Sequence, residues 1–139
     1  RFHIIVQLAQ TGADAVDPLN YAPSWSGWEG HPSGAHIMMI NGKHDETTST
    51  RAMTALMTSG DVPTIASPAW DVNPGNLRDN ALADLPVQGN REALSGDPLT
   101  MISYTTDVHG HFTIYREEEV REMVVDYWTS ALEGVPVVE

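Results

Sequence analysis

The sequence predicts an α/β fold built on a parallel sheet. The apolar run at 37–40 has the unbroken hydrophobicity of a strand that is covered on both faces, and the largely apolar segment 99–104 is again typical of a strand. Each run is followed by a polar loop and then by a segment with helical periodicity, at about 50–59 and 117–132. Because strands that alternate with helices pair in parallel, we expect a parallel sheet with flanking helices and long loops.

The length of the chain is that of one ordinary domain. Its 139 residues can bury a sizeable core, and they contain no internal repeat, low-complexity tract or domain boundary. We therefore predict a single domain over 1–139. The short apolar run at 2–9 is compatible with a strand or with the last turns of a helix.

The net charge limits the binding partners of the chain, and the lack of cysteine limits the sites that it can form. The chain carries 19 acidic and 7 basic side chains, so its formal net charge is −12. Phosphate would be repelled, which excludes nucleic acid and disfavours anionic membrane surfaces. No cysteine is present, so disulfides, zinc–thiolate sites and cysteine nucleophiles are excluded within this chain. We predict no cofactor.

The first part of the chain predicts irregular structure. From Thr11 to Pro32, glycine, proline and aspartate recur too often for long helices or strands. Three aromatic residues lie there, Tyr21, Trp25 and Trp28. We predict that they anchor this segment onto the body of the domain; the alternative is that they line an acyl or aromatic substrate pocket.

Asp45 is the first candidate functional residue. Asn41-Gly42 ends the first strand, and α/β sheets bind ligands beyond the carboxyl ends of their strands. Thr47, Thr48 or Ser49 can cap the helix at 50–59, and Gly60 is expected at its C′ position.

The middle of the chain predicts one short strand and a long connection. Residues 61–66 are predicted to form the short return strand of a crossover, with Pro63 near its start. The segment 67–98 is rich in proline and glycine and lacks a sustained period, so we expect a loop near the site. Its Trp70 and Leu77 are expected to pack rather than to act as a lid.

The last helix is predicted by a continuous apolar stripe. The stripe consists of Val120, Met123, Val124, Tyr127, Trp128, Ala131 and Leu132. Acidic residues at 117–119 suit the positive end of the helix dipole, and Gly134 and Pro136 stop the helix. Buried against the sheet, the stripe would fix the strand that carries the loop with His111.

Two short motifs give the chain a family resemblance. A Gly-x-x-Asp turn at 42–45 follows one strand, and Gly-His-Phe at 110–112 follows the later one. In this order they resemble the carboxyl-terminal half of an α/β-hydrolase. The segment at 10–22 also resembles part of some secreted or surface-attached bacterial lipases and esterases. The resemblance implies an esterase or lipase with Asp45 as triad acid and His111 as base, in the extracellular space or cell envelope.

The nucleophile of such a triad is not found in the sequence. Neither a Gly-x-Ser-x-Gly elbow nor a Gly-rich oxyanion segment occurs; in the nearest string, 30–34, the serine is one place late. We therefore expect the chain to be a partial domain that is inactive alone. Its partner would be the amino-terminal half of the same hydrolase, from the same precursor or as a separate chain, and its substrate an ester or lipid.

Other assignments of the site remain open at this stage. His109 competes with His111 as the base, and Glu46 competes with Asp45 as the acid. Asp107, His109 and His111 could instead bind a metal together with Asp45 or His44. A third possibility is a non-catalytic module that binds a partner chain through its aromatic loops.

Overall fold

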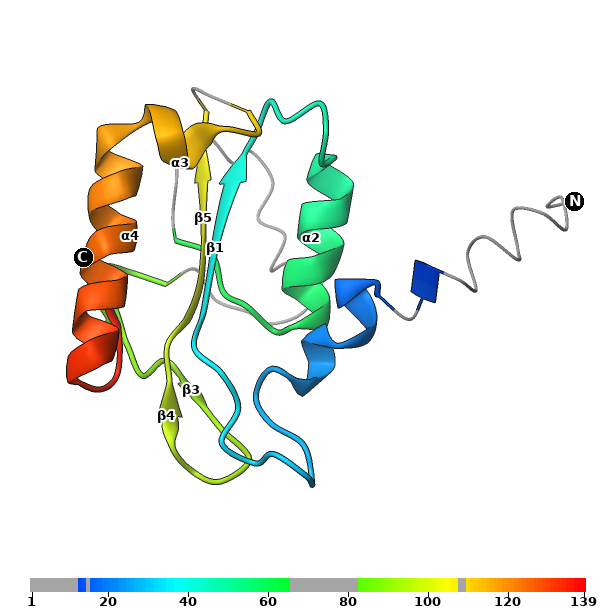
Figure 1. Cartoon of the computed structure of the whole chain (residues 1–139), viewed down its shortest axis with the longest axis vertical. Coiled ribbons are helices and arrows are strands. Elements are labelled where there is room, and N and C mark those ends of the chain that lie inside the picture. The colour runs from blue at the N-terminus through cyan, green and yellow to red at the C-terminus, as the bar shows by residue number, and fades with distance from the viewer. Residues whose placement is uncertain (1–12, 15, 66–82, 108–109) are drawn as a thin grey trace, which may run out of the picture.

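The computed structural model describes residues 13–14, 16–65, 83–107 and 110–139. Two central strands run in parallel, with one long helix on either side of them (Figure 1). In chain order the elements are η1 (Pro18–Asn20), η2 (Ala22–Ser24), β1 (Ile37–Gly42), α2 (Thr50–Ser59), β2 (Val87–Gln88), β3 (Arg91–Glu92), β4 (Pro98–Leu99), β5 (Met101–Thr106), α3 (Thr113–Arg116), α4 (Glu118–Glu133) and β6 (Val137–Val138). The predicted mixed α/β class is thus confirmed.

Strand β5 is the centre of the parallel arrangement. On one side it pairs with β1, in a register that runs from Ile37 opposite Met101 to Gly42 opposite Thr106. On its other side Thr64 forms a parallel bridge with Ser103. Within the described residues, the expected return strand forms this bridge and a second parallel bridge between Ile65 and Ala83, and β5 lies between Thr64 and β1.

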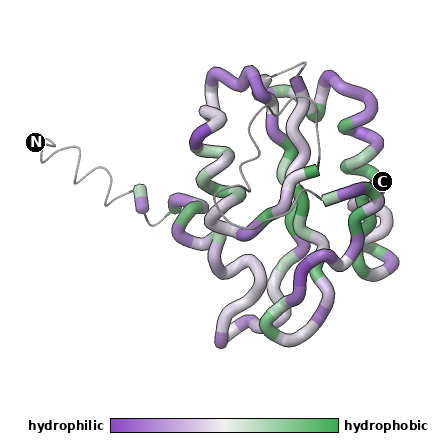
Figure 2. Tube along the Cα trace, turned by 180° about the vertical axis from the view of Figure 1, so that it is seen from behind, coloured by the Kyte–Doolittle hydropathy of each residue, from purple (hydrophilic) through white to green (hydrophobic). Residues whose placement is uncertain are grey.

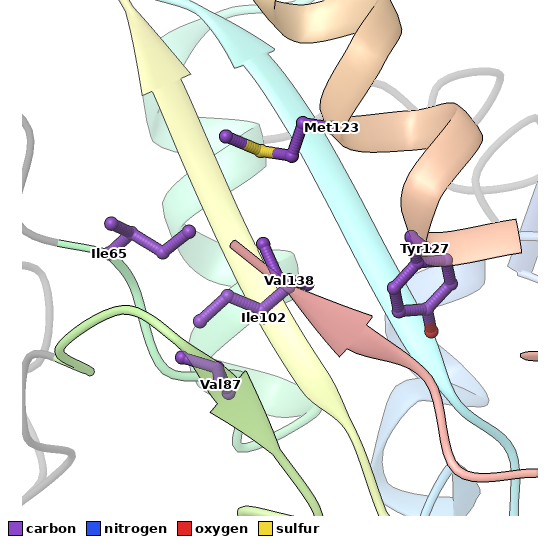
Figure 3. Packing of buried hydrophobic residues seen from close by; sticks show 6 residues of the cluster. All are labelled: Ile65, Val87, Ile102, Met123, Tyr127 and Val138. Atoms are coloured by element: carbon purple, nitrogen blue, oxygen red, sulfur yellow. The ribbon is translucent and has the colours of Figure 1, made fainter. Parts of the chain in front are cut away.

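Both faces of the pair are covered by apolar side chains. One cluster lies under α4 and consists of Ile65, Val87, Ile102, Met123, Tyr127 and Val138 (Figure 3). The other lies towards α2 and consists of Met57, Val62, Ala93, Leu99 and Met101. Consecutive residues of β5, Met101 and Ile102, belong to opposite clusters, as the two-residue period of a strand requires. In Figure 2, which colours the chain by hydropathy, hydrophobic residues lie along the strands at the centre of the domain.

The two strands differ in how well they are buried. Residues 37–40 of β1 are all half-buried, whereas five of the six residues of β5 are buried. In the described part of the chain, β5 is the one strand that pairs with β1. An apolar strand therefore forms one side of the described sheet, with an edge at which no described strand pairs.

Helix α2 has the predicted bounds and ends at the predicted glycine. Ser49 is the N-cap, since its hydroxyl accepts the N–H of Ala52 at 3.3 Å. Gly60 ends the helix as predicted, at the C-cap position and with an ordinary φ of −87°. A Cβ on Gly60 would lie 2.5 Å from the ring of Trp25, so this position is glycine to make room for the indole.

The stripe predicted for α4 is only partly buried. Val120, Met123 and Tyr127 are buried, whereas Trp128 is 70% exposed and Leu132 is 91% exposed. Successive residues of a helix turn by about 100°, which places the last two on the flank of the face that packs. The prediction that they bury against the sheet is therefore wrong. None of the described helices has the length and apolar character needed to cross a membrane.

The expected irregular connection at 67–98 contains regular pieces in its described part. β3 and β4 form an antiparallel pair, and β2 pairs with β6 near the carboxyl terminus. Leu99 belongs to β4, so the predicted strand at 99–104 instead spans 101–106. The residues at 2–9, Trp70 and Leu77 lie outside the described residues.

The aromatic residues of the first segment divide into two kinds. Trp25 packs against the cluster on the α2 side, as predicted for an anchor. Tyr21 and Trp28 are 53% and 51% exposed, so they do not bury as the prediction requires. Trp28 instead lies beside the imidazole of His31, with ring centroids 4.7 Å apart.

Candidate functional site

The structure brings Asp45 and His111 together. Asp45 lies in the loop after β1 and His111 in the loop after β5, so both follow the carboxyl ends of paired parallel strands. His111 Nδ1 lies 3.0 Å from Asp45 Oδ2, which is hydrogen-bonding distance. Sixty-six positions separate the two residues in the sequence, and the parallel register is what makes them neighbours.

The carboxylate of Asp45 is fixed by its own loop. Its Oδ1 accepts the backbone N–H groups of Thr47 at 2.7 Å and Thr48 at 2.9 Å. The side chain is only 7% exposed. Asp45 can therefore stabilise its turn and orient His111 at the same time. Its Oδ1 accepts the backbone N–H groups of the turn, and its Oδ2 contacts the imidazole.

The same contacts favour the ionised form of Asp45. The backbone N–H of Thr48 makes the largest contribution to lowering its pKa, and His111 and the N–H of Thr47 add to this; partial burial opposes them. Asp45 is therefore a carboxylate at neutral pH, as a group that orients an imidazole must be.

Acid is expected to remove the stabilisation that Asp45 provides. Its pKa in the folded chain lies below its ordinary value of 3.8, so folding is favoured above that pH. This contribution should be lost as the pH falls from about 3.8 through the lower value of the folded state. Urea unfolding between pH 6 and pH 2 measures the loss, and Asp45→Asn should flatten that part of the profile. An unchanged acid slope in Asp45→Asn would contradict this assignment.

The imidazole of His111 is accessible on its other side. Its side chain is 45% exposed, and among the described residues Asp45 is its one hydrogen-bond partner. With Nδ1 directed to the carboxylate, Nε2 is left to meet solvent or a reacting group. The ring of Phe112 meets it edge to face at 5.0 Å, and Tyr115 lies 6.5 Å further on. Phe112 and Tyr115 are themselves exposed, so an aromatic surface borders the histidine.

Gly110 allows the two loops to touch. A Cβ at this position would lie 2.7 Å from the carbonyl oxygen of His44 and 3.1 Å from the Cα of Asp45. Both are backbone atoms, which cannot move aside as the end of a side chain could. The glycine of the Gly-His-Phe string thus has a physical role in the approach of the loops, which the sequence motif alone does not reveal.

The alternative site residues are not shown to take the place of Asp45 or His111. Glu46 is exposed, and no hydrogen bond joins it to His111 within the described residues. Asp107 contacts Lys43 Nζ and His44 Nε2, both at 3.3 Å. His109 lies outside the described ranges. Within those ranges no three histidine, aspartate or glutamate side chains form a group that could hold a metal ion.

The one serine in the string at 30–34 lies at the wrong end of the sheet. Ser33 is exposed and precedes β1, and its neighbour Gly34 approaches Leu99, which precedes β5. Asp45 and His111 follow the opposite ends of those strands, which are roughly 20 Å long for six residues. Ser33 is therefore out of reach of His111.

Comparison with protein-family models, curated proteins and solved structures finds no match to this chain.

Proposed function

We propose that this chain supplies the acid and the base of a serine hydrolase that cleaves carboxylic esters. The observation that carries the proposal is the 3.0 Å contact between His111 Nδ1 and Asp45 Oδ2, made across two loops at one edge of a parallel sheet. A carboxylate fixed by two N–H groups, followed by a histidine with one open nitrogen, is the arrangement that general-base catalysis by a triad requires.

In this mechanism His111 transfers protons and Asp45 orients it. Nε2 accepts the proton of a serine hydroxyl while the serine oxygen bonds to the ester carbonyl carbon. The imidazolium then donates that proton to the alkoxide as the bond between carbon and the leaving oxygen breaks. In the second half of the reaction, Nε2 accepts a proton from water as the water oxygen bonds to the acyl carbon. The imidazolium then donates that proton to the serine oxygen as its bond to the acyl carbon breaks, which releases the carboxylic acid and restores the serine. Throughout, the Asp45 carboxylate stabilises the positive imidazolium.

The nucleophile and the oxyanion donors are assigned to a polypeptide segment outside this chain. The finer fold assignment, the carboxyl-terminal half of an α/β-hydrolase domain, is part of the same proposal. The half-buried residues 37–40, and the edge of β1 at which no described strand pairs, support a partner that adds strands there. A parallel strand in that position would end beside Asp45 and His111. An extracellular or cell-envelope location follows from the resemblance alone.

The exposed aromatic residues beside His111 favour a substrate with an apolar part. Phe112 and Tyr115 are 52% and 75% exposed and extend from the imidazole as a continuous aromatic surface. Apolar groups of an ester or lipid can pack on such a surface, whereas the net charge of −12 disfavours strongly anionic substrates.

Hydrolysis of p-nitrophenyl esters tests the proposed function. The isolated chain is expected to be inactive, and the protein that joins it to its nucleophile-bearing segment is expected to be active. A serine-directed organophosphonate should abolish that activity, and a metal chelator should leave it unchanged. Loss of activity with the chelator, together with stoichiometric bound zinc or manganese, would favour the metal site of Asp107, His109 and His111 instead.

A second candidate function is binding without catalysis. Helix α4 exposes Val125, Trp128 and Leu132, whose spacing places them on one flank of the helix. Large exposed apolar groups of this kind often contact another protein. This candidate predicts that the joined protein also lacks hydrolytic activity, while substitutions on the α4 flank weaken assembly.

A further inference from the structure

An ionic bridge joins the loop that carries Asp45 to the loop that leads to His111. Asp107 Oδ1 lies 3.3 Å from Lys43 Nζ and 3.3 Å from His44 Nε2. Lys43 and His44 directly precede Asp45, and Asp107 directly follows β5. One carboxylate oxygen thus meets two side chains from the other loop.

The bridge is placed where the sheet ends. Among the described residues, the backbone hydrogen bond between the two segments that is nearest to the loops runs from the N–H of Lys43 to the carbonyl of Thr106 at 2.9 Å. The contacts of Asp107 lie immediately beyond it, before the chain reaches Asp45 on one side and Gly110 on the other.

The contact between Asp45 and His111 depends on that separation. Each residue lies on a different loop, and the 3.0 Å hydrogen bond between them tolerates only a few tenths of an ångström of spreading. Gly110 removes the side chain that would hold the loops apart, since a Cβ there would lie 2.7 Å from the His44 carbonyl oxygen. Close approach is thus permitted by Gly110, and the ionic bridge of Asp107 is an attractive contact between the same two loops.

We infer that Asp107 is a positioning residue, which through Lys43 and His44 holds the Asp45 and His111 loops at hydrogen-bonding distance. Its relevance to catalysis rests on the proposed function, but the positioning itself is a property of this chain. It also gives Asp107 a role other than that of a metal ligand.

Proton exchange at His111 tests this inference in the isolated chain. Nuclear magnetic resonance of the ¹⁵N-labelled protein follows the Nδ1 proton that lies between His111 and Asp45. Asp107→Asn should make this proton exchange with water about threefold faster, which is the effect of losing a partly exposed ion pair. Asp97→Asn is the matched control, because it removes the same charge from the turn between β3 and β4, where Asp97 accepts the Ser95 hydroxyl at 2.7 Å.

A second variant keeps the test decisive if Asp107→Asn does not fold. Lys43→Met combined with His44→Gln removes the other side of the bridge and should produce the same faster exchange. Adding Asp107→Asn to that pair should cause no further change. Unchanged exchange in Asp107→Asn, or in the Lys43 and His44 pair, overturns the inference. It would leave the proposed function standing, since the contact between Asp45 and His111 could still be present.

Discussion

Replacement of His111 by alanine is expected to lower kcat for ester hydrolysis by about 10⁶-fold in the protein that contains the nucleophile. Without the imidazole, no group accepts the serine proton as the serine attacks, and none protonates the leaving alcohol. Asp45→Asn should lower kcat by about 10⁴-fold, because an amide that donates to Nδ1 would hold the ring in the wrong tautomer. Steady-state kinetics with a p-nitrophenyl ester measures both losses.

The matched control for this prediction is His31→Ala. His31 is an exposed histidine that lies before β1, beside Trp28, and so at the opposite end of the strands. Its replacement should leave turnover near that of the unmodified protein. Full turnover in His111→Ala, accompanied by loss of activity in His109→Ala, would show that the base had been assigned to the wrong histidine.

Replacement of Ile102 by alanine is expected to destabilise the fold by about 2–5 kcal/mol. Ile102 is fully buried in the cluster under α4, and β5 is held by neighbours on both sides, so the cavity cannot close easily (Figure 3). Urea unfolding followed by circular dichroism measures the change in the free energy of unfolding.

Leu132→Ala provides the comparison for Ile102→Ala. The sequence pattern places Leu132 on the apolar stripe of α4, but its side chain is 91% exposed. Its truncation should therefore change the free energy of unfolding by less than about 0.5 kcal/mol. Equal losses in the two variants would contradict the packing described for α4 and β5.

The sequence is most informative where a pattern is both long and local. The bounds of α2 follow from Ser49 as N-cap and from the apolar residues that the helix presents. The parallel strands follow from two apolar runs, each followed by a loop and a helix. Because parallel strands end at one edge, the same reasoning predicts that Asp45 and His111 lie in neighbouring loops.

Other features depend on contacts that are distant in the sequence. The two-residue strands β3 and β4 are too short to show a period, so their pairing could not be predicted. The apolar stripe of α4 is wider than the face that packs, and the elements that pack on the helix determine which of its residues are buried. Gly60 leaves room for the ring of Trp25, and Gly110 leaves room for the backbone of His44 and Asp45. A local sequence window does not contain these partners.

The strand boundaries illustrate the same limit. β5 continues through Thr105 and Thr106, which are buried although their side chains are polar. Thr106 also donates its hydroxyl to the carboxylate of Glu117, at 2.8 Å and 2.9 Å from the two oxygens. This contact ties the end of β5 to the start of α4, and an apolar run alone could not predict it.

The tautomer of His111 is the most direct test of the account, and long-range ¹H–¹⁵N correlation spectra of the isolated chain can determine it. The contact with Asp45 predicts that the neutral form of the imidazole carries its proton at Nδ1 and none at Nε2. Asp45→Ala should abolish this preference, and Glu46→Ala, its neighbour in the same loop, should retain it. An imidazole protonated at Nε2 in the unmodified chain, or one that does not respond to the loss of Asp45, would contradict the pairing on which the proposed function depends.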